Sequence, residues 1–163
     1  MRYAEVLDCD VANGKRVGVS IFIQGCPEPH CKGCFNSSAW EFTGGEELSD
    51  EKIENFYKMI DHSYIKRISI LGGEPLCEQN IDEVTYLAQS CKERFPDKKI
   101  WVWSRYSFND IFSCKIAKYI DYIVDGEFIL EQKDLSLAFR GSANQKIWEK
   151  QEDGSWVNRS DEL

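Results

Sequence analysis

The sequence predicts an α/β fold built on a mostly parallel sheet, and three observations support this prediction. Strand-like and helix-like segments alternate along the chain, which is the order that βαβ units produce. A length of 163 residues is typical of one domain and is enough to bury a core without disulfides. A hydrophobic content of 42% and a charged content of 29% are ordinary for a soluble globular protein.

The first half of the chain contains two predicted strands and one predicted helix. Residues 17–24 are apolar and β-branched, and they predict a strand that leads directly into a cysteine-rich loop. Ser49 is the predicted N-cap of a helix that continues to about Ile60 with apolar residues on one face. Residues 68–71 predict a short buried strand that ends at Gly72-Gly73.

The second half continues the alternation. Asn80 and Glu83 resemble a capping box at the start of a helix that ends before Pro96. Three further elements are then predicted, namely a strand at 100–103, a helix near 109–118 and a strand at 119–124. The pattern weakens after Gly126, so we expect a domain over residues 1–150 and a polar C-terminal tail over residues 151–163.

Charge and composition exclude several function classes. A net charge of −8 makes binding to nucleic acid through phosphate contacts a poor fit. No apolar stretch approaches the roughly 20 residues of a transmembrane helix, so we expect no membrane association. No signal peptide is visible, and seven cysteines are an odd number for a disulfide scaffold. These features predict a cytoplasmic protein whose thiols stay reduced.

Three cysteines, Cys26, Cys31 and Cys34, lie within nine residues of one loop. Thiolates select zinc, Cu(I) or iron–sulfur clusters. Three thiolates bind three irons of a [4Fe–4S] cluster and leave the fourth iron open to a substrate. The prolines and glycines of the loop allow it to curl around such a cluster.

Two other interpretations of these cysteines stay open at this point. One is a zinc site with His30 or a distant cysteine as the fourth ligand, and the other is a loop without metal. Structural zinc sites more often combine two C-x-x-C pairs, and the pair Cys31–Cys34 has no counterpart. Iron–sulfur binding is therefore favoured. No role is assigned to the four scattered cysteines, Cys9, Cys77, Cys91 and Cys114.

The turn Gly72-Gly73-Glu74 is a second candidate site. Two glycines allow a ligand to approach the backbone closely, and Glu74 could accept a hydrogen bond from an ammonium group. The cysteine loop, this glycine turn and the turn Ser104-Arg105 each follow a predicted strand. In parallel sheets, ligands bind beyond the carboxyl ends of the strands, so we expect these segments to meet.

The chain resembles the radical-SAM activating proteins of anaerobic (class III) ribonucleotide reductases. The matching stretches extend over most of the chain, and they are residues 13–16, 21–26, 31–36, 71–76, 124–128 and 134–145. The last of these is the most specific, because radical-SAM enzymes in general lack it.

The sequence departs from the family pattern at two places. Four residues, rather than the usual three, separate Cys26 from Cys31, while the spacing from Cys31 to Cys34 is kept. The extra residue is expected to bulge the loop and to leave all three ligands in place. The turn at Ser104-Arg105 also differs from the family's Thr-Gly-Tyr-like turn, so no role is carried over to Arg105.

The resemblance implies a fold, a ligand set and a cofactor site. The fold would be an incomplete, open (β/α) barrel of the radical-SAM type, since a complete barrel needs about 250 residues. Cys26, Cys31 and Cys34 would be the catalytic ligands of one [4Fe–4S] cluster. The residues that would contact S-adenosylmethionine are Gly72, Gly73 and Glu74 at its methionine end, and backbone near Gly33, Cys34 and Phe35.

The resemblance also implies a reaction and its partners. A reduced flavodoxin would supply one electron, and S-adenosylmethionine would be cleaved to methionine and a 5′-deoxyadenosyl radical. That radical would abstract hydrogen from a glycine on the large subunit of the anaerobic ribonucleotide reductase. Three alternatives stay open: activation of another glycyl-radical enzyme such as a formate-lyase, a small-molecule radical-SAM reaction such as that of a deazaguanine synthase, and a zinc-binding interaction module.

Overall fold

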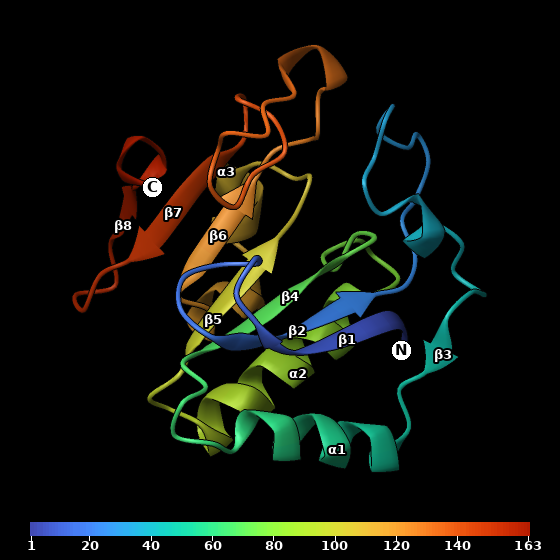
Figure 1. Cartoon of the computed structure of the whole chain (residues 1–163), viewed down its shortest axis with the longest axis vertical. Coiled ribbons are helices and arrows are strands. Elements are labelled where there is room, and N and C mark those ends of the chain that lie inside the picture. Colours follow the sequence, from blue (N-terminus) through green and yellow to red (C-terminus); the bar gives the residue numbers. More distant parts are fainter.

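The computed structural model describes all 163 residues, which form one eight-stranded sheet with helices packed against it (Figure 1). The strand order is β3-β1-β2-β4-β5-β6-β7-β8. The strands are β1 (Arg2–Asp10), β2 (Gly18–Ile23), β3 (Glu46–Glu47), β4 (Arg67–Gly72), β5 (Lys99–Trp103), β6 (Tyr122–Asp125), β7 (Lys146–Lys150) and β8 (Trp156–Asn158). The helices are α1 (Asp50–Ile60), α2 (Ile81–Arg94) and α3 (Phe108–Phe112), with 3₁₀ turns η1 (Ser37–Ala39), η2 (Lys115–Lys118), η3 (Leu130–Gln132) and η4 (Ser160–Glu162). None of these helices has the length and apolar character needed to cross a bilayer.

The expectation of a mostly parallel sheet in an incomplete (β/α) barrel of the radical-SAM type is wrong. The sheet is open and mixed, and four of its seven strand pairings are antiparallel. Only the central strands β2, β4, β5 and β6 are parallel to their neighbours within that group. The sequence pattern missed the flanking strands β1, β3, β7 and β8, which account for every antiparallel pairing.

The edge of the sheet beside β1 is irregular. The short strand β3 pairs with β1 only at Arg2 and Tyr3, so most of β1 has no outer neighbour. The pairing of β1 with β2 shifts register twice, between Tyr3 and Glu5 and between Leu7 and Asp10. Such shifts are β-bulges or irregularities, and they bend and twist the strand locally.

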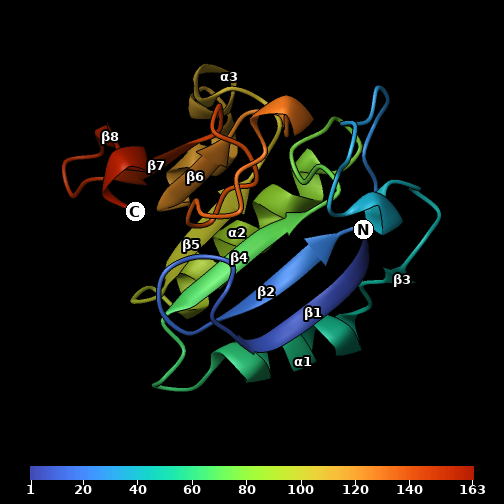
Figure 2. The ribbon, with the colours of Figure 1, turned by 45° about the horizontal axis from the view of Figure 1, so that its top comes forward.

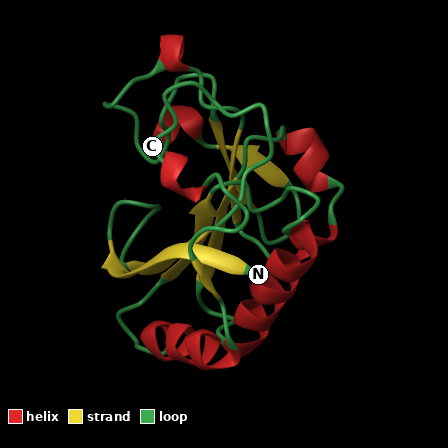
Figure 3. Cartoon of the chain, turned by 90° about the vertical axis from the view of Figure 1, so that its right-hand side faces the viewer, coloured by secondary structure: helices red, strands yellow, loops and turns green.

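The main core lies between the sheet and helices α1 and α2, which cover the same face of the sheet (Figure 2). Side chains alternate between the two faces of a strand, so Ile68 and Ile70 of β4 point into this core. Phe56 and Ile60 of α1 and a row of apolar residues on α2 complete it. In a side view, the two long helices lie below and to the right of the strands, and long loops gather at the top (Figure 3).

The opposite face of the sheet bears an aromatic cluster and a buried polar cluster. Trp101 of β5 stacks on Tyr122 of β6 with ring centroids 4.0 Å apart. Arg67 of β4 is 1% exposed and donates from Nη2 to the carbonyl oxygen of Asp10 at 2.6 Å. Its Nη1 donates to the carbonyl oxygen of Asn13, so Arg67 holds the connection between β1 and β2 against the sheet.

The helices predicted from the sequence have different outcomes. Helix α1 is confirmed together with its cap, because the Ser49 hydroxyl accepts a hydrogen bond from the Lys52 N–H. Helix α2 is also confirmed, but Asn80 makes no side-chain cap bond, so its capping-box role is wrong. The helix expected near residues 109–118 is wrong as one element, because α3 ends at Phe112 and a separate 3₁₀ turn follows.

Candidate functional site

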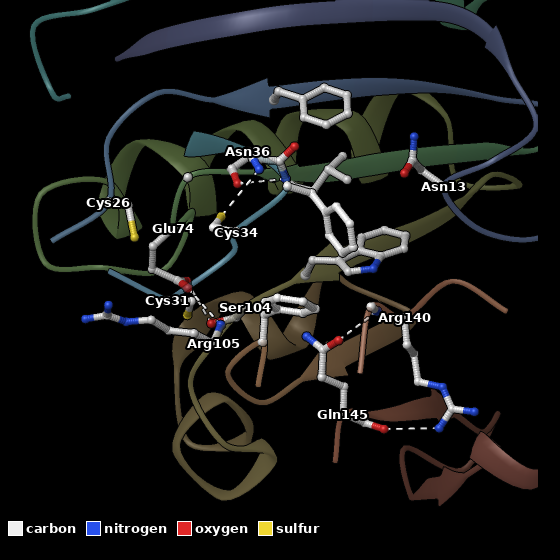
Figure 4. Close-up of a pocket in the computed structure, with 18 of the residues that line it drawn as sticks. Asn13, Cys26, Cys31, Cys34, Asn36, Glu74, Ser104, Arg105, Arg140 and Gln145 are labelled. Carbon is white, nitrogen blue, oxygen red and sulfur yellow. Dashed lines mark hydrogen bonds between the residues drawn. The ribbon is translucent and has the colours of Figure 1, made fainter. Parts of the chain in front are cut away.

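A cavity of about 470 Å³ lies where the four central strands end. These strands are parallel, so their carboxyl ends share one edge of the sheet, and the loops that leave them line the cavity. The predicted meeting of the three turns is therefore confirmed. The lining includes Cys26, Cys31, Cys34, Phe35, Gly72, Gly73, Glu74, Ser104 and Arg105 (Figure 4).

The cysteine loop begins with a tightly packed glycine. The N–H of Gly25 donates to the Ala39 carbonyl oxygen at 2.7 Å, and the N–H of Cys26 donates to that of Trp40 at 2.9 Å. Gly25 has φ +105°, and a β-carbon there would collide with the ring of Phe42. Only glycine combines this left-handed conformation with so little space, so the chain turns sharply just before Cys26.

His30, the last residue between Cys26 and Cys31, is turned toward the protein. Its ring stacks on Trp40 with centroids 4.1 Å apart, and its Nε2 hydrogen-bonds with the Cys26 carbonyl oxygen at 2.8 Å. His30 is not among the cavity-lining residues. No group of three or more His, Cys, Asp or Glu side chains converges on one metal-ion position in the structure.

Burial has the largest effect on the pKa values of two of the three thiols, Cys26 and Cys31. It raises the pKa of Cys26 to about 11, although the Arg105 charge acts in the opposite direction. Burial also raises the pKa of Cys31, and a backbone hydrogen bond from Phe128 partly offsets this effect. A metal or cluster binds the thiolate forms, so binding at this loop releases protons.

Asn36 connects the third thiol to the glycine turn. Its backbone N–H donates to Cys34 Sγ at 3.4 Å, and its side-chain amide donates to the Gly72 carbonyl oxygen at 3.3 Å. Hydrogen bonds to sulfur are one of the ways in which proteins tune iron–sulfur centres. Asn36 thus contacts both the cysteine loop and the glycine turn.

Glu74 is 1% exposed and lies between the glycine turn and β5. Its Oε1 accepts hydrogen bonds from the Leu76 N–H at 3.0 Å and the Ser104 hydroxyl at 2.7 Å, and its Oε2 accepts one from the Arg105 N–H at 2.8 Å. Burial raises the pKa of this carboxyl, and these donors together with the Arg105 charge counter that effect. Oε2 accepts only this one hydrogen bond, so it can accept another from a ligand.

The glycines of the turn are required by neighbouring backbone. A β-carbon on Gly73 would lie 2.7 Å from the Ala39 carbonyl oxygen and would collide with that of Gly25. Gly72 has φ +120°, and a β-carbon there would collide with the backbone of β2. Both residues let the turn pack against the strand and loop that lead to Cys26. This reason differs from the ligand approach expected from the sequence.

Asn80 supports the site in a way that the sequence did not indicate. Its side-chain amide donates to the carbonyl oxygens of Gln24, Gly25 and Glu74 at 3.3, 3.4 and 3.1 Å. These contacts join the end of β2, the glycine turn and the start of α2. No local pattern identifies them, because the partners lie up to 56 residues away in the chain.

Residues 134–145 form the wall of the cavity across from Cys26 (Figure 4). Gln145 organises this segment: its Oε1 accepts hydrogen bonds from the N–H groups of Gly141 and Ser142, and its Nε2 donates to the Gly126 carbonyl oxygen. Arg140 donates to the carbonyl oxygens of Gln145 and Ser160. The segment singled out in the sequence is thus part of the same cavity as the cysteines.

Comparison with known proteins matches this architecture to a family. Residues 12–148 match the family model described as a 4Fe-4S single cluster domain. The chain is 36% identical over 158 residues to the anaerobic ribonucleoside-triphosphate reductase-activating protein of Enterobacteria phage T4, covering 96% of this chain and 98% of that protein. The proteins of the same name from Vibrio cholerae and Escherichia coli K12 are 38% and 32% identical, each covering 90% of this chain and 97% of the relative. The chain therefore belongs to the family of anaerobic ribonucleoside-triphosphate reductase-activating proteins and carries a 4Fe-4S single cluster domain.

Proposed function

We propose that this chain activates an anaerobic ribonucleotide reductase by generating a glycyl radical on it, through reductive cleavage of S-adenosylmethionine. The observation that supports this function is the joint placement of the three-cysteine loop and the Gly72–Glu74 turn in one cavity. The family relationship, which extends over most of the chain, supports the same conclusion.

The donor set fits a [4Fe–4S] cluster with one iron left open. Three cysteines line the cavity, and the other four do not. Cys77 and Cys91 are buried in the protein, Cys9 is exposed, and Cys114 is half-buried outside the cavity. Three thiolates and no fourth cysteine match a cluster with one non-cysteine coordination position. We therefore assign Cys26, Cys31 and Cys34 as the cluster ligands.

The remaining cavity residues orient the bound groups. A reduced cluster held by Cys26, Cys31 and Cys34 would supply the electron for cleavage of S-adenosylmethionine, and the cleaved cofactor would supply the radical that takes hydrogen from the target glycine. We assign Glu74, through the free capacity of Oε2, as acceptor for the ammonium of the methionine end. Gly72 and Gly73 line this end, and the backbone of Cys34 and Phe35 is the proposed contact along the cofactor. Gly33, also expected from the sequence to contact the cofactor, is not among the cavity-lining residues and packs against Leu130 and Phe128.

The cavity also determines how a protein substrate could reach the reacting atoms. Apolar side chains such as Phe22, Leu71, Trp103 and Phe139 line it and disfavour water. At its rim, Phe35 is 56% exposed and Leu135 is 79% exposed. We propose that the glycine-bearing segment of the reductase enters past these two residues. A flavodoxin is the proposed electron donor, in a cytoplasm that keeps the seven free cysteines reduced.

The test is anaerobic reconstitution with iron and sulfide, followed by reduction with dithionite in the presence of S-adenosylmethionine. We expect about four irons per chain, formation of 5′-deoxyadenosine, and a glycyl radical signal when the reductase is added. Cys31→Ala should lose cofactor cleavage, whereas Cys114→Ala, outside the cavity, should keep it. Stoichiometric zinc without iron uptake, or a Cys31→Ala protein with full cleavage, would contradict the proposal.

Specificity for the reductase is tested separately. The loaded protein is incubated with the reductase, with a formate-lyase and with small-molecule substrates. Radical formation on the reductase alone is the expected result. Cofactor cleavage coupled only to one of the other substrates would reject the reductase as the target while keeping the radical chemistry.

A further inference from the structure

The segment between Cys26 and Cys31 has no backbone hydrogen bonds of its own. The bonds of Cys26 to Trp40 and of Cys34 to Cys31 flank it, and residues 27–30 take part in no backbone–backbone hydrogen bond. Pro27 and Pro29 contribute no N–H group. A loop of this kind needs side chains from elsewhere to fix its shape, because free backbone retains conformational entropy.

His30 is fixed by its stacking on Trp40, and Arg105, just after β5, supplies contacts to the rest of the segment. Its Nη1 donates to the carbonyl oxygen of Pro27 at 3.0 Å and to that of Pro29 at 2.9 Å. The two carbonyls flank Glu28, so one guanidinium nitrogen joins both sides of the loop's extra length. The backbone N–H of Arg105 donates at the same time to Glu74 Oε2 at 2.8 Å. Figure 4 shows the side chain of Arg105 extended from Ser104 toward the side of the cavity that bears Cys26.

We propose that Arg105 is a positioning residue that holds the four-residue interval between Cys26 and Cys31 in the shape required for cluster binding. This inference rests on the proposed function, since it assumes that the three cysteines bind the cluster. The sequence departs from the family pattern in the longer Cys26–Cys31 interval and in the arginine after Ser104. The structure links these two departures, because the Arg105 side chain contacts the backbone of that interval.

The position of the guanidinium has an electrical consequence. It contacts the carbonyl of the residue next to Cys26, so its positive charge lies beside the proposed cluster. A nearby positive charge stabilises the added electron and raises the reduction potential of a cluster. A residue that only stabilised the fold would not change the reduction potential of the cluster. The potential therefore distinguishes a role of Arg105 beside the cluster from a role in folding alone.

The experiment compares reconstituted wild-type protein with Arg105→Gln and Arg105→Lys. Charge-assisted hydrogen bonds are lost in Arg105→Gln, so iron should be lost to a chelator about tenfold faster, and the cluster potential should become more negative. Arg105→Lys keeps the positive charge but carries its donor on a shorter, more flexible and more strongly hydrated side chain, so it should lose iron faster at a nearly unchanged potential. Arg94→Gln is the matched control, because Arg94 lies on α2 and forms an exposed ion pair with Glu54.

Deletion of Glu28 in the Arg105→Gln background tests the link to loop length. Shortening the interval to three residues should return the rate of iron loss toward that of the wild type. Wild-type iron retention and potential in Arg105→Gln would overturn the inference, as would iron loss that the deletion does not reverse. Circular dichroism checks folding, and the Arg105 N–H bond to Glu74 survives both substitutions. A wild-type chain that binds no cluster would instead overturn the proposed function and this inference together.

Discussion

Asp10 and Arg67 form a buried ion pair on the face of the sheet that bears the cavity. Their side chains are 6% and 1% exposed, and Asp10 Oδ2 lies 3.4 Å from Arg67 Nη2. Burial alone would raise the pKa of Asp10, but hydrogen bonds from Ser20, Ala12 and Asn13 and the charge of Arg67 outweigh burial and lower it. Asp10 therefore stabilises the fold in its ionised form.

Asp10→Asn should lower the free energy of unfolding by about 3–5 kcal/mol at neutral pH, because it leaves a buried guanidinium without its counter-charge. The folded-state pKa of Asp10 lies below its unfolded value, so its contribution is present at neutral pH and is lost as the pH falls through the folded-state pKa. Urea denaturation at several pH values should show the gap between wild type and variant narrowing toward acid. The exposed control Asp97→Asn should change little, and a gap that stays constant with pH would contradict this account.

At the level of elements, the sequence predicted the central part of the molecule better than its flanks. The strands at 17–24, 68–71 and 100–103 appear as β2, β4 and β5, because continuous apolar runs mark buried parallel strands. Strand β1 alternates exposed and half-buried positions irregularly and gave no clear pattern. Antiparallel pairing at the flanks depends on such weakly patterned strands, so the mixed character of the sheet could not be predicted.

The site shows the same division between local and distant information. The cysteine loop and the glycine turn are contiguous motifs, and both line the cavity as expected. The roles of Asn80 and Arg105 depend on partners 55–56 and 76–78 residues away, which no local spacing reveals. Asn80 also shows how a tertiary contact can replace the helix cap that its position suggests.

The glycine turn should not tolerate a methyl group. In Gly73→Ala the β-carbon would meet the carbonyl oxygens of Gly25 and Ala39, and overpacking of this kind costs about 1–3 kcal/mol. We expect a lower melting temperature and faster iron loss, because the same backbone leads to Cys26. Gly154→Ala is the control, since a β-carbon there has no neighbour within 4 Å and only its positive φ is strained. Equal melting temperatures and equal iron loss in the two variants would contradict the clash.

The loop after β6 provides the test of partner entry. Leu135→Ser removes an exposed apolar side chain at the cavity rim, so 5′-deoxyadenosine formation without the reductase should be unchanged. The glycyl radical yield at limiting reductase should fall about tenfold, as expected if Leu135 is buried against the reductase in the complex and that contact is lost. Tyr86→Ser, on the 71% exposed Tyr86 of α2, should have no effect on either measurement. An unchanged radical yield in Leu135→Ser would exclude this rim as the entry route.

At the level of the whole molecule, residues 151–163 pack against and hydrogen-bond with the domain that we propose for residues 1–150. Strand β8 pairs with β7, and the Ser160 hydroxyl accepts a hydrogen bond from the Ile147 N–H at 2.9 Å. The Ser160 carbonyl oxygen accepts one from Arg140, which lines the cavity. The C-terminal segment thus contacts the wall formed by residues 134–145 without contributing a proposed ligand.

A chain that ends at Lys150 should therefore fold and bind iron, but with a free energy of unfolding lower by about 2–4 kcal/mol from the lost hydrogen bonds and strand pairing. A chain that ends at Ser160 retains β8 and should lose much less. Chemical denaturation and iron content measure the two effects. A chain ending at Lys150 that is fully folded but binds no iron would show that the tail belongs to the site.

The irregular edge beside β1 bears on solubility. An unpaired strand edge invites pairing with another chain, and proteins protect such edges with bulges, charge and very short neighbouring strands. All three occur here: β3 covers only Arg2 and Tyr3, β1 changes register twice, and the exposed side chains of Glu5 and Asp8 add negative charge. The protein is thus protected against fibrillar self-association even before a cluster is inserted.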